Sequence, residues 1–332
     1  MRVSVAISTF NGVPYISEQL DSILAQTRCP DEIVIRDDSS SDTTVMVLKE
    51  YEKKNNGIIK VINDGHRLGC DKSFIECIRN TSGDVIFPCD QDDIWLPTKI
   101  ETMLRYLESN NYDLVYAQDY DFYQETGVLV EAPVSLPPLD KSIYYCYLKG
   151  HTCAFRRHLI SLFDFNGLIT WDYYLAVYSV ASGRYAECRE FLMKWRRHSS
   201  SQTFAASQTE MTASAAKQDG KWETCKNALL WLAKGNKSEC IAERFSARAL
   251  FLDFLSSGYP VSKETRKYSK VLWLISQQTV TSVLRASVIS AFLSLFSKDS
   301  RRQPVRIRLA RMLHDFRTPA SFIFTERNKL AL

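Results

Sequence analysis

The strongest constraint on the fold of this chain is an alternation of strand and helix patterns through its first 120 residues. Runs rich in β-branched residues predict strands at 3–8, 32–36, 58–62, 84–88 and 113–117. Between them, apolar residues recur at helical spacing, with Asp71 expected to cap the third helix and Pro97 to begin the fourth. Repeated strand–helix–strand units predict a mostly parallel sheet with helices on both faces.

Polar clusters follow four of these predicted strands. They occupy residues 8–11, 37–38, 63–69 and 90–93. Ligands of open α/β sheets bind outside the carboxyl ends of the strands, where these clusters would meet. The sequence therefore predicts one ligand site along this edge of the sheet.

The cluster Asp90-Gln91-Asp92-Asp93 places three carboxylates within four residues. Like charges this close repel one another unless a cation or hydrogen bonds compensate them. Carboxylate oxygens are typical ligands of Mg²⁺ or Mn²⁺, and substrate phosphates often complete the coordination shell of Mg²⁺. An acidic N-terminus for the following helix is the alternative, but it would explain Asp93 rather than all three residues.

Composition narrows the protein class without identifying a function. The chain has 332 residues, 42 Lys or Arg against 38 Asp or Glu, and 45% hydrophobic residues, as in ordinary globular proteins. The basic excess is too small to indicate a nucleic-acid partner. Nine cysteines without CxxC spacing favour reduced thiols in a cytoplasmic protein over a zinc site. The N-terminus reads as a strand and turn rather than a signal peptide, and no apolar run is long enough for a transmembrane helix.

The pattern weakens after residue 120. Short strands are expected at 152–155 and 190–195, with a helix at 173–181 between them. Prolines at 133, 137 and 138 indicate a loop, residues 199–201 read as a linker, and the chain from about 204 onward is expected to be helical.

Three segments carry a resemblance to a known family. VSVAISTFNG at 3–12, EIVIRDDSSSDT at 32–43 and DQDDIWLPTK at 90–99 resemble family 2 glycosyltransferases of the GT-A fold, in particular the bacterial O-antigen or capsule group often described as rhamnosyltransferases. The resemblance covers about residues 1–200. It implies a catalytic domain with a nucleotide-sugar half (1–120) and an acceptor half (121–200), followed by a helical region (201–332).

The resemblance also implies roles for individual residues. A nucleotide-sugar donor would contact Thr9, Asn11, Asp37, Asp38, Arg67, Asp90, Gln91 and Arg197. A carboxylate at 37 or 38 could accept the N3–H of uracil or thymine, although Asp38 could also be a turn residue. Lys72 is an alternative to Arg67 as the phosphate-binding cation. The expected ligands of a divalent metal, Mg or Mn, are Asp90, Asp92, Asp93 and His198.

The acceptor is expected to contact Trp95, His151, Thr152 and Trp171. Trp95 could equally pack beneath the site. Asp172 matches the position of the family's catalytic base, with Trp-Asp where Glu-Asp is commoner, and Asp119 and Asp121 are the other candidate bases. A carboxylate at a helix start can also serve only the helix dipole.

The C-terminal region combines an apolar helical stripe at 271–297 with a basic run at 298–332, which holds nine Lys or Arg and three Asp or Glu. This pattern is typical of a membrane-surface element on anionic lipid, and the alternative is ordinary packing against the catalytic domain. We therefore expect peripheral contact with the inner face of the cytoplasmic membrane.

Together these features predict an inverting glycosyltransferase. It would move a sugar from dTDP-rhamnose or a UDP-hexose to a hydroxyl of a lipid-diphosphate-linked bacterial surface glycan, with no nucleic-acid partner. A sugar-nucleotide pyrophosphorylase is an alternative, but Ser8–Gly12 lacks its glycine-rich phosphate loop. A non-catalytic nucleotide-sugar or carbohydrate-binding module is the other, and the oligomeric state stays open.

Overall fold

The structure is a computed structural model that describes residues 1–55, 57–164, 170–198, 232–233, 238–296 and 319. The chain divides into two compact units. The first contains the described residues of 1–137, 146–164 and 170–198, and the second contains 138–145 and the described residues beyond 231. The expected domain boundary at residue 200, Cys225 and all the basic residues of the 298–332 run lie outside the described residues.

The first unit contains one sheet, and the first half of this sheet is parallel. Its strands are β1 (Val3–Thr9), β2 (Glu32–Asp37), β3 (Ile59–Ile62) and β4 (Val85–Cys89), in the spatial order β3-β2-β1-β4. Helices α1 (Ile16–Leu24), α2 (Thr44–Lys54) and α3 (Cys70–Arg79) connect them. The alternation of strand and helix in the sequence is confirmed, because every neighbouring pair in this half is parallel.

The remaining strands make the sheet mixed. Beyond β4 come β8 (Cys153–Arg156), β6 (Leu114–Tyr123), β9 (Tyr185–Arg197) and β5 (Ile94–Trp95), while β7 (Val128–Ala132) pairs with β6. Strand β8 is antiparallel to both β4 and β6, whereas β6 and β9 are parallel. The predicted mostly parallel sheet is therefore confirmed, and β8 inserts an antiparallel strand at its centre.

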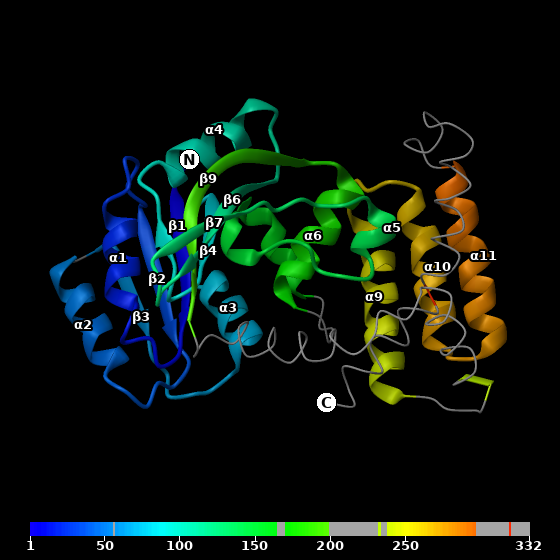
Figure 1. The fold of residues 1–332 in the computed structure, drawn as a ribbon, viewed down its shortest axis with the longest axis horizontal. Helices are drawn as coiled ribbons and strands as arrows, with labels where there is room; N and C mark the ends of the chain where they lie inside the picture. The colour runs from blue at the N-terminus through cyan, green and yellow to red at the C-terminus, as the bar shows by residue number, and fades with distance from the viewer. Residues whose placement is uncertain (56, 165–169, 199–231, 234–237, 297–318, 320–332) are drawn as a thin grey trace. The chain divides into compact units, whose positions relative to one another are not determined.

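Helices cover both faces of this sheet (Figure 1). Alternate β1 residues Val3, Val5 and Ile7 share a buried core with residues of α1, α2 and α4 (Lys99–Ser109). On the other face, α3 packs on β1 and β2 and also contacts α6 (Trp171–Ser182). Burying both faces leaves the strand ends as the place where polar side chains reach solvent.

Several local predictions were wrong in detail. Gly69, at φ +82°, is the N-cap of α3, and Asp71 lies in its first turn instead of capping it. Helix α4 begins at Lys99 with Thr98 as N-cap, two residues after Pro97. Strand β7 was missed, because its residues follow a turn at Gly127 and most of them are exposed, so no buried face marks them in the sequence.

The second unit is helical in its described residues. It contains α5 (Leu139–Ser142), α9 (Glu239–Gly258), α10 (Glu264–Ser276) and α11 (Val280–Phe296). Part of the apolar stripe is core, since Val271, Leu272 and Val283 are fully buried, whereas Val288 is 58% exposed. None of the described helices is both long enough and apolar enough to cross a membrane.

Candidate active site

A cavity of about 510 Å³ opens at the carboxyl ends of the parallel strands. All four predicted polar clusters contribute to it, as its lining shows: Ser8, Thr9, Phe10, Asn11, Pro14, Tyr15, Asp38, Arg67, Gly69, Cys70, Phe74, Asp90, Gln91, Asp92, Trp195 and His198. The predicted meeting of these clusters at one edge of the sheet is thus confirmed.

The Asp37–Asp38 pair divides into two different environments. Asp37 is fully buried and accepts hydrogen bonds from the Thr9 hydroxyl (3.0 Å) and from both the backbone N–H and the hydroxyl of Ser40. Asp38 lines the cavity, and its carboxylate accepts from Arg36 (2.8 Å) and two backbone N–H groups. The geometry therefore makes Asp37 a turn-forming residue and leaves Asp38 as the carboxylate facing the cavity.

The loop after β1 is fixed by Gln91. The Gln91 side-chain oxygen accepts from the Phe10 N–H (2.9 Å), and its amide donates to the Phe10 carbonyl (3.2 Å). A Cβ on Gly12 would lie 2.5 Å from this Gln91 oxygen, so glycine is needed for the approach. Asn11 lines the cavity at φ +50° and accepts from the Ser41 N–H (2.9 Å). Gln91 thus holds the wall of the cavity in addition to lining it.

Arg67 is the cation that the structure places at the cavity. Its guanidinium carbon lies 4.2 Å from the centre of the Phe10 ring, in a cation–π arrangement. The alternative cation, Lys72, is exposed and is not among the residues that line the cavity. This geometry favours Arg67 as the group that could meet an anionic ligand.

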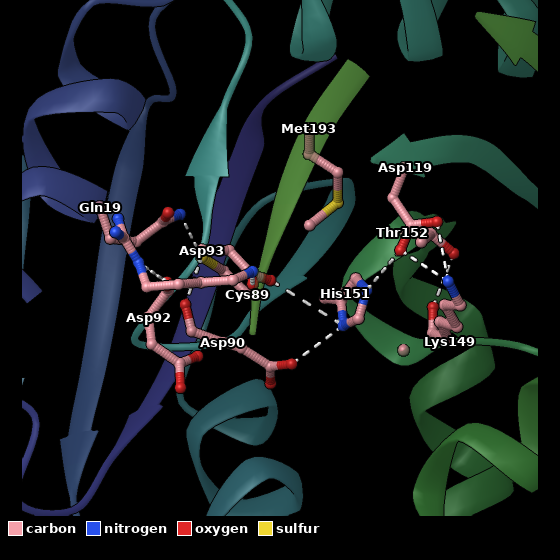
Figure 2. A network of polar contacts seen from close by, with 12 residues as sticks. Gln19, Cys89, Asp90, Asp92, Asp93, Asp119, Lys149, His151, Thr152 and Met193 are labelled. Atoms are coloured by element: carbon pink, nitrogen blue, oxygen red, sulfur yellow. Dashed lines mark hydrogen bonds and ion pairs between the residues drawn. The ribbon is translucent and has the colours of Figure 1, made fainter. Parts of the chain in front are cut away.

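The acidic cluster separates into two groups. Asp90 Oδ2 lies 2.9 Å from His151 Nδ1, whereas Asp92 Oδ2 lies 3.0 Å from His198 Nε2. Asp93 is fully buried; its Oδ1 accepts from the Arg196 N–H (3.2 Å), and its Oδ2 lies 3.9 Å from His151 Nδ1. Figure 2 shows Asp90, Asp93 and Asp119 around the His151 ring.

His151 lies next to the acidic cluster and not in the lining of the cavity. It was expected to bind acceptor, but it is buried and does not line the cavity. Desolvation lowers the pKa of His151, yet the charge of Asp93 and hydrogen bonds with Asp119 and Asp90 outweigh it and raise the pKa to about 10. Lys149 donates to Asp119 from the other side (2.8 Å). His151 is therefore held among three carboxylates, which its sequence position alone did not indicate.

The carboxylates suit a divalent cation in their chemistry. Asp90, Asp93 and His151 offer ligand atoms that all lie within 4.8 Å of one another. Burial, with the charges of Asp90 and Asp92, raises the pKa of Asp93 to about 8 against the opposing effect of His151. Within the described part of the chain, no group forms a hydrogen bond with the Asp93 Oδ2 atom. Asp90, Asp92 and His198 instead line the cavity, where a ligand could share the ion. The residues present therefore fit a hard divalent ion, with Asp90 common to both groups.

Asp172 is the second residue of helix α6, which contacts the cavity-lining helix α3. Its Oδ1 accepts from the Thr170 hydroxyl (2.5 Å) and the Tyr173 N–H (2.9 Å). Desolvation and the nearby Asp71 charge raise the pKa of Asp172. Asp172 does not itself line the cavity, but Cys70 does. Desolvation raises the pKa of the Cys70 thiol to about 12, together with the charges of Asp90, Asp71 and Asp172. Cys70 thus lies within electrostatic reach of the cavity-lining Asp90 and of Asp172.

The other predicted acceptor residues are buried around the cavity. Trp171 packs against the cavity-lining Phe74 with ring centres 5.2 Å apart. Trp95 is 2% exposed and packs against Phe87, in agreement with the alternative of packing beneath the site. Thr152 is fully buried, and its hydroxyl donates to the Lys149 carbonyl (2.7 Å).

Arg197 and its partner lie outside the cavity lining. The Arg197 guanidinium lies over the Trp195 ring at 3.5 Å and forms an ion pair with Asp121 at 3.1 Å. Arg197 is thus paired with Asp121. The sequence analysis expected Arg197 to contact the donor and gave Asp121 as a candidate base. A donor contact by Arg197 stays a prediction.

Comparison with known proteins identifies the family. Residues 4–163 match the family described as "Glycosyl transferase family 2". The chain carries a family 2 glycosyltransferase domain. This glycosyltransferase is 27% identical over 175 residues to the Escherichia coli "UDP-Glc:alpha-D-GlcNAc-diphosphoundecaprenol beta-1,3-glucosyltransferase WfgD", a match that spans 52% of this chain and 67% of that one.

A second relative agrees with the family, and a solved structure agrees with the fold. The glycosyltransferase is 30% identical over 169 residues to the "dTDP-rhamnosyl transferase RfbG" of Shigella flexneri, covering 49% of this chain and 57% of that protein. The structure of S. aureus TarS 1–349 in complex with UDP-GlcNAc superposes with a TM-score of 0.52 at 16% identity, covering 96% of this chain and 90% of that one. At this identity the likeness shows the fold, which is GT-A as expected.

Proposed function

We propose that this glycosyltransferase transfers a sugar from a nucleotide-diphosphate donor, with inversion, to a hydroxyl of a lipid-linked surface glycan. The observation that carries the proposal is the cavity, which brings the Asp90 and Asp92 carboxylates, Asp38 and the Arg67 guanidinium to one sheet edge. This combination suits a ligand that has a polar base at one end and a diphosphate at the other. The arrangement would be unexpected in a protein that only binds a neutral glycan.

The donor class follows from the cavity and the relatives. Asp38 offers a carboxylate edge, and Phe10 and Tyr15 offer aromatic surface to a nucleobase or ribose. The named relatives use UDP-Glc in one case and dTDP-rhamnose in the other. Both nucleotides carry a pyrimidine, so we propose a UDP-hexose or dTDP-rhamnose as the donor.

Asp90, Asp92 and His198 are the residues that we propose to hold Mg²⁺ or Mn²⁺ at the cavity, with Asp93 buried behind them. Such an ion would act as a Lewis acid toward the charge that develops on the departing diphosphate. The protein contributes a rigid setting for these ligands, because the Arg196 guanidinium donates to the Asp92 carbonyl (2.7 Å) and the Arg196 N–H donates to Asp93.

We propose Asp172 as the general base. The carboxylate would take the proton from the acceptor hydroxyl as the oxygen attacks the anomeric carbon from the face opposite the diphosphate, which inverts its configuration. Its raised pKa makes the carboxylate a stronger proton acceptor than an exposed aspartate. Asp119 and Asp121 are less suited, because each already forms an ion pair, with Lys149 and Arg197 respectively.

The acceptor and the location are proposed from the relatives and the sequence pattern. WfgD is named for an undecaprenol-linked acceptor, which resides in a membrane. The basic run at 298–332 would add about 1 kcal/mol of attraction for each Lys or Arg near an anionic surface. We therefore propose a lipid-diphosphate-linked glycan as acceptor and peripheral contact with the inner face of the cytoplasmic membrane.

A panel of nucleotide sugars tests the proposal directly. The protein is incubated with dTDP-rhamnose, UDP-glucose, UDP-galactose and UDP-N-acetylhexosamines, and release of nucleoside diphosphate is measured with Mn²⁺, Mg²⁺ or EDTA. We expect slow donor hydrolysis that requires the metal. In a parallel incubation with added pyrophosphate, release of a sugar 1-phosphate and a nucleoside triphosphate would identify a pyrophosphorylase instead. Binding without any turnover would identify a non-catalytic module.

A further inference from the structure

Arg36 is a fully buried arginine in the middle of the parallel sheet. It is part of β2, where its register partners are Ser8 of β1 and Ile62 of β3. A charged side chain is rarely buried unless it is paired, because desolvation costs more than a single contact returns. The hydrogen-bond partners of this guanidinium therefore indicate the role of Arg36.

The guanidinium binds one loop at two points. Its NH2 group donates to Asp64 Oδ1 (3.1 Å) and to the His66 carbonyl (2.9 Å). Its NH1 group donates to Asp38 Oδ1 (2.8 Å) and to the Ser73 hydroxyl (3.0 Å). Arg36 thus connects the sheet, the Asp38 carboxylate and the segment after β3.

Asp38 binds the same loop at two further points. Its carboxylate accepts the Leu68 N–H (2.7 Å) and the Gly69 N–H (2.9 Å). Burial raises the pKa of Asp38, but these bonds and the Arg36 guanidinium outweigh it and hold the pKa below its usual value. The Arg36–Asp38 pair therefore holds residues 64–69 through four of their polar groups.

Arg67 lies inside the segment that this pair holds. Its guanidinium reaches the cavity over the Phe10 ring, at 4.2 Å, and the residue itself is exposed. An exposed arginine has many rotamers, so its position depends on where its backbone is fixed. Groups that contact a ligand act well only when a supporting shell holds them in place.

We propose that Arg36 is a positioning residue for donor binding, because its guanidinium and the Asp38 carboxylate hold the 64–69 loop so that Arg67 stays at the cavity. This inference rests on the proposed function, since it takes the cavity to be the nucleotide-sugar site. Arg36 touches no ligand in this scheme and acts through the groups that it holds, which are the loop and the Asp38 carboxylate. Its loss should therefore weaken donor binding while the chemical step is preserved.

The test compares donor KM and kcat for the native protein with those for Arg36→Met, Arg36→Lys and Asp64→Ala. For Arg36→Met we expect donor KM to rise about 10-fold, the size seen when an orienting residue is lost, and kcat at saturating donor to stay within about twofold. Arg36→Lys should recover part of the loss. Asp64→Ala should give a smaller rise in donor KM, and it remains informative if Arg36→Met does not fold, because the Asp64 side chain is 41% exposed.

A double variant separates positioning from general destabilisation. If Arg36 acts largely through Arg67, Arg36→Met combined with Arg67→Ala should weaken the binding of UDP or dTDP by clearly less than the sum of the two single losses in binding free energy. Ser73→Ala is the matched control, since it removes a partner of Arg36 that is not in the loop, and its donor KM should be native.

Unchanged donor KM in a folded Arg36→Met or in Asp64→Ala would overturn the inference, as would additive losses in the double variant. If the native protein binds neither UDP nor dTDP and hydrolyses no sugar derivative of either, the proposed function itself is overturned and the inference with it. Native donor binding alongside unaffected variants would overturn the inference alone.

Discussion

Replacing Gly150 with alanine should disturb the start of helix α6 and, through it, Asp172. A Cβ at Gly150 would lie 2.3 Å from Cη2 and 2.4 Å from Cζ2 of the Trp171 ring. Carbon atoms pack at about 3.5–4.0 Å, so the ring would have to move by more than about 1 Å. Trp171 is only 6% exposed and packs on Phe74, so it has little room to move without taking the helix start with it.

The size of the effect follows from this geometry. Forcing an extra methyl group into a packed site costs about 1–3 kcal/mol, and each kcal/mol lowers the Tm of a domain of this size by about 2–4 °C. Asp172 is the next residue in the helix, and a displacement of about 1 Å in a catalytic group can cost about 10²-fold. We therefore expect Gly150→Ala to lower Tm by several degrees and kcat by about 10- to 100-fold.

Thermal unfolding and steady-state transfer assays measure the two effects. Gly258→Ala is the control, because its added methyl group would meet no atom of the described residues within 4 Å, and it should leave kcat unchanged. The three Trp171 atoms nearest the added Cβ all belong to the six-membered ring of the indole. Trp171→Phe removes that ring, so the double variant with Gly150→Ala should be more stable than the sum of the single losses predicts. Native Tm and kcat in Gly150→Ala, or additive losses in the double variant, would refute the reasoning.

Three further outcomes are expected. Asp92→Ala should abolish transfer and remove the dependence of donor binding on divalent metal, measured by calorimetry with and without EDTA; full activity would contradict the metal site. Asp172→Asn should fold and bind donor natively yet lose transfer by about 10²-fold or more, and near-native turnover would move the base elsewhere. Asp113 is buried, which raises its pKa, but hydrogen bonds from His158, Arg184 and Tyr178 hold the pKa well below its usual range. This stabilisation is full above the unfolded pKa of about 3.9 and is lost as pH falls toward the lowered value, so Asp113→Asn should show a smaller drop in Tm between pH 6 and pH 3 than the native protein; equal drops would show that another group governs acid unfolding.

The parallel half of the fold was predictable because its signals are local. β-Branched runs such as residues 32–36 and helical spacing of apolar residues determine each element from its own sequence. Strand β8 pairs antiparallel with β4 and β6, and this depends on where residues 153–156 return in space. No local pattern encodes that return, so the mixed half of the sheet could be predicted only through the family resemblance.

The location of the site was also predictable from local sequence patterns, but the contacts within it were not. The position of Asp38, Asp90 and Asp92 at the strand ends follows from the sheet, and all three line the cavity. What the sequence did not indicate is which partner each polar group meets. His151 was assigned to acceptor binding because of its neighbours in the chain, yet Asp90 and Asp119, 61 and 32 residues away, surround it.

The structure also distinguishes residues that would contact a ligand from residues that hold the contacting groups in place. Gln91 and Asp37 resemble ligand-binding residues in the sequence, but hydrogen bonds to Phe10 and to Thr9 and Ser40 occupy their polar atoms. A side chain whose polar atoms are already paired gains little from a ligand, because binding would only exchange one hydrogen bond for another. Substituting Gln91 should therefore weaken donor binding by releasing the loop at Phe10, and a variant that also lacks the Phe10 ring should show no additional loss.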